Sequence, residues 1–295
     1  MYEVAVPAIL LAIMISMGME LSLADFRRVV EMPRATLIGL AGQMLLLPVA
    51  GLAFAHWPGF TPTIAMGIVI VAACPGGATS NLFSYLARAN VALSVTLTSL
   101  SSTLCFVTIP FWIGLGLDLF LNEAGGETAP IDLPVGRMVV QLFVLTLLPV
   151  AIGMGIRARW PEFSARIRTR LRRAMTALMA GALVIIVGSE WESVVRDLRD
   201  ASAAALMLVT GMLLVSYAGA RASQLDDRDA FTISIEVGLQ NGALATTVVV
   251  ALLERPELVV FPGAYAVLSF IPVVAWTFFM RRRVVPDAMT ADPEA

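Results

Sequence analysis

Apolar residues fill long stretches of this chain, and polar residues gather in the short connections between them. A membrane helix needs about 20 predominantly apolar residues to span about 30 Å of hydrocarbon. Nine stretches come near this length: 4–22, 35–54, 62–87, 91–117, 135–157, 173–190, 202–220, 230–254 and 256–280. The first lacks the basic start and the small-residue cleavage site of a signal peptide. We therefore predict an all-α polytopic membrane protein with about nine transmembrane helices.

Arginines gather in alternate connections, which predicts the orientation of the chain. They follow the first, third, fifth, seventh and ninth helices, as Arg27, Arg28, Arg34, Arg88, Arg157, Arg159, Arg166, Arg168, Arg170, Arg172, Arg173, Arg221, Arg228, Arg281, Arg282 and Arg283. The opposite connections 55–61 and 118–133 hold none, and 191–200 is the weak point of the pattern. By the positive-inside rule the N-terminus is outside and the tail 284–295 is cytoplasmic. We expect a multi-pass protein of the cell (inner) membrane.

Composition agrees with this class and excludes others. Hydrophobic residues make up 58% of the chain and charged residues 14%, whereas a soluble domain carries about 25% charged residues. The net charge of −2 gives no reason to expect a nucleic-acid partner. Two cysteines exclude a disulfide framework. The one histidine, His56, leaves no histidine metal cluster and no His-based hydrolytic triad, so we do not expect an enzyme.

The predicted helices divide into two repeats around one connection. Residues 1–117 hold four helices, 118–134 form a loop, and 135–283 hold five helices. If the first four helices match the last four, the third helix pairs with the eighth. These two enter the membrane from opposite sides, as in an inverted-topology repeat, which is a common plan for transporters.

The third predicted helix is interrupted by a polar, glycine-rich stretch. This stretch reads Cys74-Pro75-Gly76-Gly77-Ala78-Thr79-Ser80-Asn81. Proline cannot donate a helix hydrogen bond and clashes with the preceding turn, and glycine does not favour helical geometry. We predict a break at mid-membrane, where irregular backbone is tolerated only against protein or a wet cavity. A simple proline kink is the alternative, but three successive polar side chains need partners.

The eighth predicted helix contains a carboxylate inside an apolar span. The stretch reads Glu236-Val237-Gly238-Leu239-Gln240-Asn241-Gly242. A charge at this depth costs roughly 2.5–3.5 kcal/mol on insertion scales, so it must be paired or neutralised. No arginine lies at a comparable depth in any predicted helix. A bound cation is the natural partner. A proton, or a protonated glutamate that is hydrogen-bonded across helices, is the alternative.

Other oxygen-bearing side chains can join this carboxylate. Gln43 lies in the middle of the second helix, and Ser94 and Thr98 are four residues apart, hence on one face of the fourth. Together with Ser80, Asn81, Glu236 and Gln240 they form a set of hard oxygen ligands, which suits a hard cation. One carboxylate among neutral oxygens fits a monovalent cation better than calcium, whose sites usually hold several carboxylates.

At these residues the sequence resembles the bile acid:sodium symporter family. The resemblance rests on Cys-Pro-Gly-Gly-x-x-Ser-Asn at 74–81, Tyr-Leu-Ala-Arg at 85–88, Asn-Val-Ala-Leu-Ser at 90–94 and Glu-Val-Gly-x-Gln-Asn at 236–241. Likeness extends over about residues 5–280. It implies a panel domain and a core domain, the core built from helices within 35–117 and 202–280, with two broken helices that cross near mid-membrane.

The resemblance also implies two sodium ions, bound as coupling ions and not as a cofactor. The first would bind Ser80, Asn81, Ser94, Thr98 and Glu236. The second would bind Gln43, Gln240, Glu236 and backbone carbonyls near Val237 and Leu239. An organic anion would bind near Ala78, Thr79, Asn241 and Ser269. Family members often begin with a further helix and carry a His-Asn pair where this chain has Phe270-Ile271, so we expect a less polar cavity wall.

We therefore expect sodium-coupled symport of an organic anion, such as a bile acid or a small carboxylate, by alternating access in a lipid bilayer. A proton-coupled carrier or an efflux permease on the same scaffold is the alternative, and Cys74 beside the break admits a metalloid oxyanion. A channel is a further possibility, although a channel needs a continuous pore. The sequence does not indicate the substrate, the stoichiometry of sodium, the direction of transport or the oligomeric state.

Overall fold

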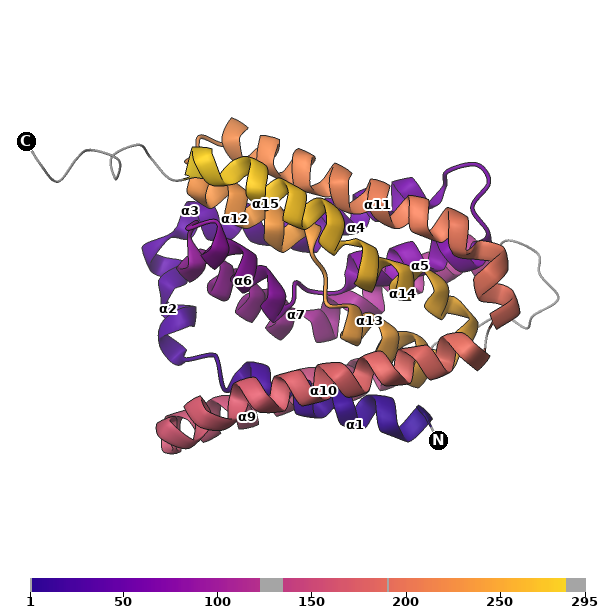
Figure 1. The fold of residues 1–295 in the computed structure, drawn as a ribbon, viewed down its shortest axis with the longest axis horizontal. Coiled ribbons are helices and arrows are strands. Elements are labelled where there is room, and N and C mark those ends of the chain that lie inside the picture. Colours follow the sequence, from indigo (N-terminus) through magenta and orange to yellow (C-terminus); the bar gives the residue numbers. More distant parts are fainter. Residues whose placement is uncertain (1, 123–134, 190, 285–295) are drawn as a thin grey trace, which may run out of the picture.

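In a computed structural model of the chain, residues 2–122, 135–189 and 191–284 are described, and their regular elements are all helical (Figure 1). The α-helices are α1 (Tyr2–Gly18), α2 (Leu23–Glu31), α3 (Pro33–Ala41), α4 (Leu47–Ala55), α5 (Pro62–Ala73), α6 (Ala78–Leu86), α7 (Val91–Leu117), α8 (Val135–Leu142), α9 (Leu148–Arg159), α10 (Pro161–Ser189), α11 (Trp191–Ala222), α12 (Asp227–Gly238), α13 (Gly242–Thr247), α14 (Val260–Leu268) and α15 (Phe270–Val284). Shorter helical turns connect some of them: η1 (Gly42–Leu46), η2 (Asp118–Asn122), η3 (Phe143–Leu147), η4 (Val248–Leu252) and η5 (Pro256–Val259).

Both predicted breaks are present, and they lie against each other. Helix α5 ends at Ala73 and α6 begins at Ala78, while α12 ends at Gly238 and α13 begins at Gly242. The N–H of Asn241 donates to the carbonyl of Pro75 at 2.9 Å, and Gly76 and Gln240 form an antiparallel bridge. The extended backbone of each break therefore satisfies part of the hydrogen bonding of the other.

The described helices make the chain a multi-pass membrane protein. Six helices are long and apolar enough to cross a membrane, or seven if the pair α1 and α2, bent by 74°, is one span. The nine expected crossings are therefore not confirmed by length and composition. The third and eighth predicted helices fall short because each is divided at its break, which leaves the apolar pieces Pro62–Ala73 and Gly242–Leu252.

Two predicted connections are wrong, because they are helical. The basic stretch 157–172 belongs to α9 and α10, which are separated only at Trp160, and the stretch 191–200 opens α11. Hydropathy detects the part of a helix in lipid, whereas arginine is a good helix former and Pro161 starts α10 at the position where proline fits. Residues 118–122 of the predicted loop 118–134 are also helical. The rest of that loop, and the tail 285–295, lie outside the described residues.

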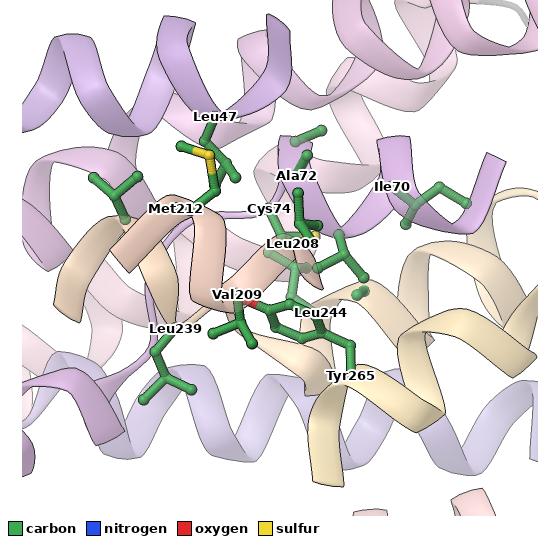
Figure 2. Close-up of a cluster of buried hydrophobic side chains, with 14 of the residues drawn as sticks. Leu47, Ile70, Ala72, Cys74, Leu208, Val209, Met212, Leu239, Leu244 and Tyr265 are labelled. Atoms are coloured by element: carbon green, nitrogen blue, oxygen red, sulfur yellow. The ribbon is translucent and has the colours of Figure 1, made fainter. Parts of the chain in front are cut away.

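Helices α1, α9 and α10 form a layer along one side of the molecule (Figure 1). The remaining helices pack on the other side, where α11 contacts α12 and α14 and where α5 contacts α4 and α7. Buried apolar side chains from these helices converge beside the two breaks (Figure 2). They include Leu47, Ile70, Ala72, Leu208, Val209, Met212, Leu239, Leu244 and Tyr265. This close packing holds the irregular backbone at a defined position.

Backbones meet directly where α1 crosses α9. A Cβ atom on Gly153 of α9 would lie 2.2 Å from the carbonyl oxygen of Ile15, and one on Gly18 would lie 2.2 Å from that of Val150. Without a strong hydrophobic drive in lipid, helices associate through such close van der Waals contacts. The layer therefore depends on residues that have no side chain at these two points.

We expect Gly153→Ala to destabilise the protein, because its methyl group would press against backbone that cannot yield; overpacking costs about 1–3 kcal/mol. Gly155→Ala, in the same helix, is the matched control, since no atom lies within 4 Å of its added Cβ. The thermal midpoint of unfolding in detergent should fall by several degrees in the first variant and stay level or rise in the second. Equal midpoints would contradict the contact.

Candidate functional site

The carboxylate of Glu236 lies at the centre of a cluster of oxygen atoms. Its side chain is fully buried in α12. Ser80 Oγ donates to Glu236 Oε2 at 2.6 Å, and Thr98 Oγ1 donates to Oε1 at 2.5 Å. Ser94 Oγ lies 3.3 Å from Oε2. Three hydroxyl groups from two other helices therefore converge on one carboxylate.

Asn81 completes this cluster with an amide oxygen. Ser94 Oγ lies 2.8 Å from Asn81 Oδ1, and Thr98 Oγ1 lies 3.4 Å from it. Each hydroxyl carries one proton and two lone pairs. Three protons are thus shared among the two carboxylate oxygens, the Asn81 oxygen and the carbonyl of Gly77, which Ser80 Oγ also contacts at 2.7 Å. The cluster offers more lone pairs than protons, which is the property of a cation site.

Local sequence explains how these atoms meet. Ser80 and Asn81 lie in the first turn of α6, directly after the first break, and Ser94 and Thr98 share one face of α7. Asn90 caps α7, and its amide nitrogen donates to Asp229 Oδ1 at 2.7 Å on α12. The beginning of α7 is thereby tied to the helix that carries Glu236.

The charge of Glu236 has no basic partner in the described ranges. None of the ion pairs found there includes Glu236. Hydrogen bonds from three hydroxyl groups reduce the cost of a buried carboxylate but do not neutralise it. A dehydrated monovalent cation would do so, with the carboxylate, hydroxyl and amide oxygens as its ligands.

Gly76 leaves the space in which this carboxylate lies. A Cβ atom on Gly76 would approach Glu236 Oε1 to 2.3 Å. The same atom on Gly77 would meet nothing closer than 3.8 Å. The two adjacent glycines thus differ in function: the first permits close approach of backbone to carboxylate, and the second has room for a side chain.

The second predicted ion site contains two glutamines in contact. Gln43 Nε2 donates to Gln240 Oε1 at 2.7 Å and to the carbonyl of Cys74 at 3.0 Å. Gln240 Nε2 donates to the carbonyl of Val237 at 2.7 Å and lies 3.3 Å from that of Glu236. In this structure the glutamine amides therefore donate hydrogen bonds to the backbone carbonyl oxygens that an ion would need.

The structure brings most of the predicted ion ligands together, in two neighbouring groups. The N–H of Leu239 bonds the carbonyl of Ile235, and Leu239 also lines the cavity described below. Tyr265, which sequence reasoning did not select, donates its hydroxyl to the carbonyl of Gly238 at 2.6 Å. This bond satisfies the end of α12 and holds the second break in place.

A cavity of about 280 Å³ lies beside the breaks, between the α1–α10 pair and the helices α6, α13 and α14. Thr79, Asn241 and Ser269, three of the predicted substrate residues, line it. Ala78 begins α6 next to it, but its side chain lies outside the described part. Most of the remaining wall is apolar and includes Phe270, in line with the less polar cavity that we expected.

Sequence reasoning missed the contribution of α10 to this cavity. Arg172 and Thr176 line it. Arg172 lies in the basic stretch that we interpreted as a determinant of topology, so its charge carried no separate signal. Arg172 and Thr176 are four residues apart, and that they share one helix face was clear only once this stretch was known to be helical.

Comparison with known proteins places this geometry in a family. The model of the Sodium Bile acid symporter family matches residues 7–197, which is more than half of the chain. The chain belongs to this family. The resemblance stated from the motifs is confirmed, and the family is one of transporters and not of enzymes.

Curated relatives agree with the assignment. The chain is 29% identical to a rice protein, "Probable sodium/metabolite cotransporter BASS2, chloroplastic", over 93% of this chain and 63% of the rice protein. It is 29% identical to the "Uncharacterized sodium-dependent transporter YocS" of Bacillus subtilis over 81% and 71%, and 26% identical to the human "Ileal sodium/bile acid cotransporter" over 88% and 74%. The chain spans less than two thirds of the length of the rice protein and of an Arabidopsis relative.

We predict that Gly76→Ala weakens sodium binding because its methyl group displaces the Glu236 carboxylate from the oxygen cluster. A loss of about tenfold in affinity corresponds to about 1.4 kcal/mol, and we expect at least that. Sodium affinity is measured by adding sodium stepwise to a buffer that initially holds neither sodium nor potassium, and by following the thermal midpoint of unfolding. Gly77→Ala is the matched control and should bind sodium like the wild type; equal effects of the two substitutions would contradict the model of the site.

Proposed function

We propose that this protein is a sodium-coupled symporter of an organic anion, such as a bile acid or a small carboxylate. The observation that carries this proposal is the buried Glu236 carboxylate, surrounded by hydroxyl and amide oxygens and without a basic partner in the described ranges. A cation supplied from solution would neutralise it and stabilise the helices that meet there.

Two sodium ions would bind in the two groups of oxygens. The first ion would take Ser80, Asn81, Ser94, Thr98 and Glu236 as ligands. The second would take Gln43, Gln240 and backbone carbonyls such as those of Val237 and Leu239, with Glu236 near both. For this ion to bind, the two glutamines would have to turn amide oxygens toward it. Contacts to the ion would then replace the hydrogen bonds that now join Gln43 to Gln240 and Gln240 to the carbonyl of Val237.

The organic anion would bind in the cavity next to these ions. Thr79 and Ser269 offer hydroxyl groups there, and the amide of Asn241 offers its NH2 group, because its oxygen already accepts from the N–H of Leu244. The first N–H groups of α6 begin at Ala78 and carry the positive end of a helix dipole, which favours an anion. Sodium would prepare this wall by ordering the adjacent break.

Alternating access would arise from movement between two groups of helices. We infer a panel that contains the layer of α1, α9 and α10, and a core that contains the helices of 35–117 and 202–280. The cavity between the α1–α10 pair and α6, α13 and α14 supports this division. The pairing of two breaks from the first and second halves supports an inverted repeat of 1–117 and 135–283.

We further propose nine crossings, with the N-terminus outside and the C-terminus in the cytoplasm of a cell (inner) membrane. With the bent pair α1 and α2 counted as one span, seven candidate spans and the divided spans α5–α6 and α12–α13 would make nine crossings. The arginine-rich ends of α9, α10 and α15 would then lie on the cytoplasmic side, as the positive-inside rule requires.

The position of Cys74 argues against efflux of a metalloid oxyanion, because this cysteine was the only specific feature that suggested it. Cys74 is fully buried and is not among the residues that line the cavity. Proton coupling through Glu236 is separated from sodium coupling by the experiment that follows.

Glu236→Gln should abolish sodium-dependent uptake into proteoliposomes, because the amide cannot neutralise a cation. Uptake of radiolabelled taurocholate and pyruvate is measured in sodium and in choline at one fixed pH. Wild-type protein should transport at least one of them in sodium only. Glu257→Gln, which removes a surface carboxylate that contacts Arg255, should leave uptake unchanged. Uptake that is equal in choline and depends on a pH gradient would replace sodium by protons as the coupling ion.

A further inference from the structure

One charged side chain lines the cavity among the residues that the structure describes, and it comes from α10. Arg172 borders the cavity together with Thr176, one turn further along the same helix. The wall formed by α6, α13 and α14 carries Thr79, Asn241 and Ser269. A ligand in this cavity is therefore met by neutral polar groups from one side and by a cation from the other.

Arg172 has an internal partner in this structure. Its guanidinium contacts the carboxylate of Glu20 at 2.6 Å, just after the end of α1. The two side chains keep 35% and 23% of their surface exposed, so the pair is neither deeply buried nor fully solvated. A guanidinium has five N–H donors, and this contact uses one of them. The group can therefore bind a second acceptor, or exchange Glu20 for one.

We propose that Arg172 binds the acidic group of the transported anion from the α10 side, and that Glu20 is a competing internal ligand of the same guanidinium. This inference rests on the proposed function and deepens it, since it assigns a specificity-determining residue. Arginine matches a carboxylate through two parallel N–H donors, which a lysine cannot reproduce. Thr176 adds a hydroxyl on the same helix face.

The charge distribution of the cavity indicates which ligands fit. Because the rest of the wall is neutral and mainly apolar, a single acidic group on an apolar body is the matching chemistry. The volume of about 280 Å³ lies just below the range of about 300–1,000 Å³ of ligand pockets. A compact monocarboxylate therefore fits the cavity in this structure. When no monocarboxylate is bound, Glu20 neutralises Arg172.

A purely structural role for the Arg172–Glu20 pair is the competing explanation. Partly exposed ion pairs contribute little to stability, and this one joins α10 to the end of α1. The two explanations predict different changes in anion affinity when Glu20 is replaced. Either Arg172→Gln or Glu20→Gln breaks the pair, so a structural role makes the two variants behave alike. If Glu20 competes with the anion, its removal strengthens anion binding, whereas removal of Arg172 weakens it.

The test is ligand binding to the purified full chain in saturating sodium. Isovalerate and taurocholate serve as compact and bulky carboxylates, and isovaleramide serves as the neutral counterpart of the first. Dissociation constants are obtained by calorimetry for wild type, Arg172→Gln, Arg172→Lys and Glu20→Gln. For the carboxylate that the wild type binds, we expect a loss of about tenfold or more in Arg172→Gln, a smaller loss in Arg172→Lys and a gain of about threefold in Glu20→Gln. Isovaleramide should bind weakly and equally to all four proteins.

Sodium-dependent stabilisation without an organic anion is the internal control, because Arg172 and Glu20 lie outside both groups of ion ligands. It should be equal in all variants. Unchanged carboxylate affinity in Arg172→Gln, or equal losses in Arg172→Gln and Glu20→Gln, would overturn the inference and leave the sodium site standing. If neither carboxylate binds a wild type that sodium does stabilise, the inference fails together with the substrate class. Absence of any sodium effect would instead remove the proposed function itself.

Discussion

A carboxylate buried among hydroxyl groups, with no basic side chain beside it in the part of the chain that the structure describes, is the constraint on which this structure depends. Glu236 can remain charged only if a positive charge from outside the protein reaches it. Three helices supply oxygens at the point where that charge would be held. The two helix breaks bring the oxygens of α6 and α7 to α12. Gly76 provides the room, since a methyl group in its place would lie only 2.3 Å from a carboxylate oxygen of Glu236.

Much of this centre could be predicted from the sequence because its signals are local. Proline and glycine between apolar runs indicated both breaks, and a carboxylate in an apolar span indicated a cation. Features that arise only in three dimensions gave no such signal. The hydroxyl of Tyr265 and the space beside Gly76 belong to residues that are ordinary in a membrane helix, and their importance comes from atoms far away in the chain.

The extent of the helices was harder to predict than their existence. Hydropathy identifies the residues in contact with lipid, but α10 and α11 each begin in polar sequence before their apolar part. The stretch 157–172 looked like a loop because its arginines are frequent, although arginine supports a helix as well as most residues do. Once this stretch is helical, Arg172 and Thr176 share a face toward the cavity, and a residue that seemed to set only topology becomes part of a binding wall.

The backbone contact between the two breaks has a mechanical consequence. Because the N–H of Asn241 is bound to the carbonyl of Pro75 and Gly76 is bridged to Gln240, sliding of one divided span past the other would sever both connections. The two breaks are thus tied to each other as one unit. In the carrier that we propose, the ion ligands would travel as one body, so the ion would be exchanged by exposing this unit to one solution or the other and not by taking its binding site apart.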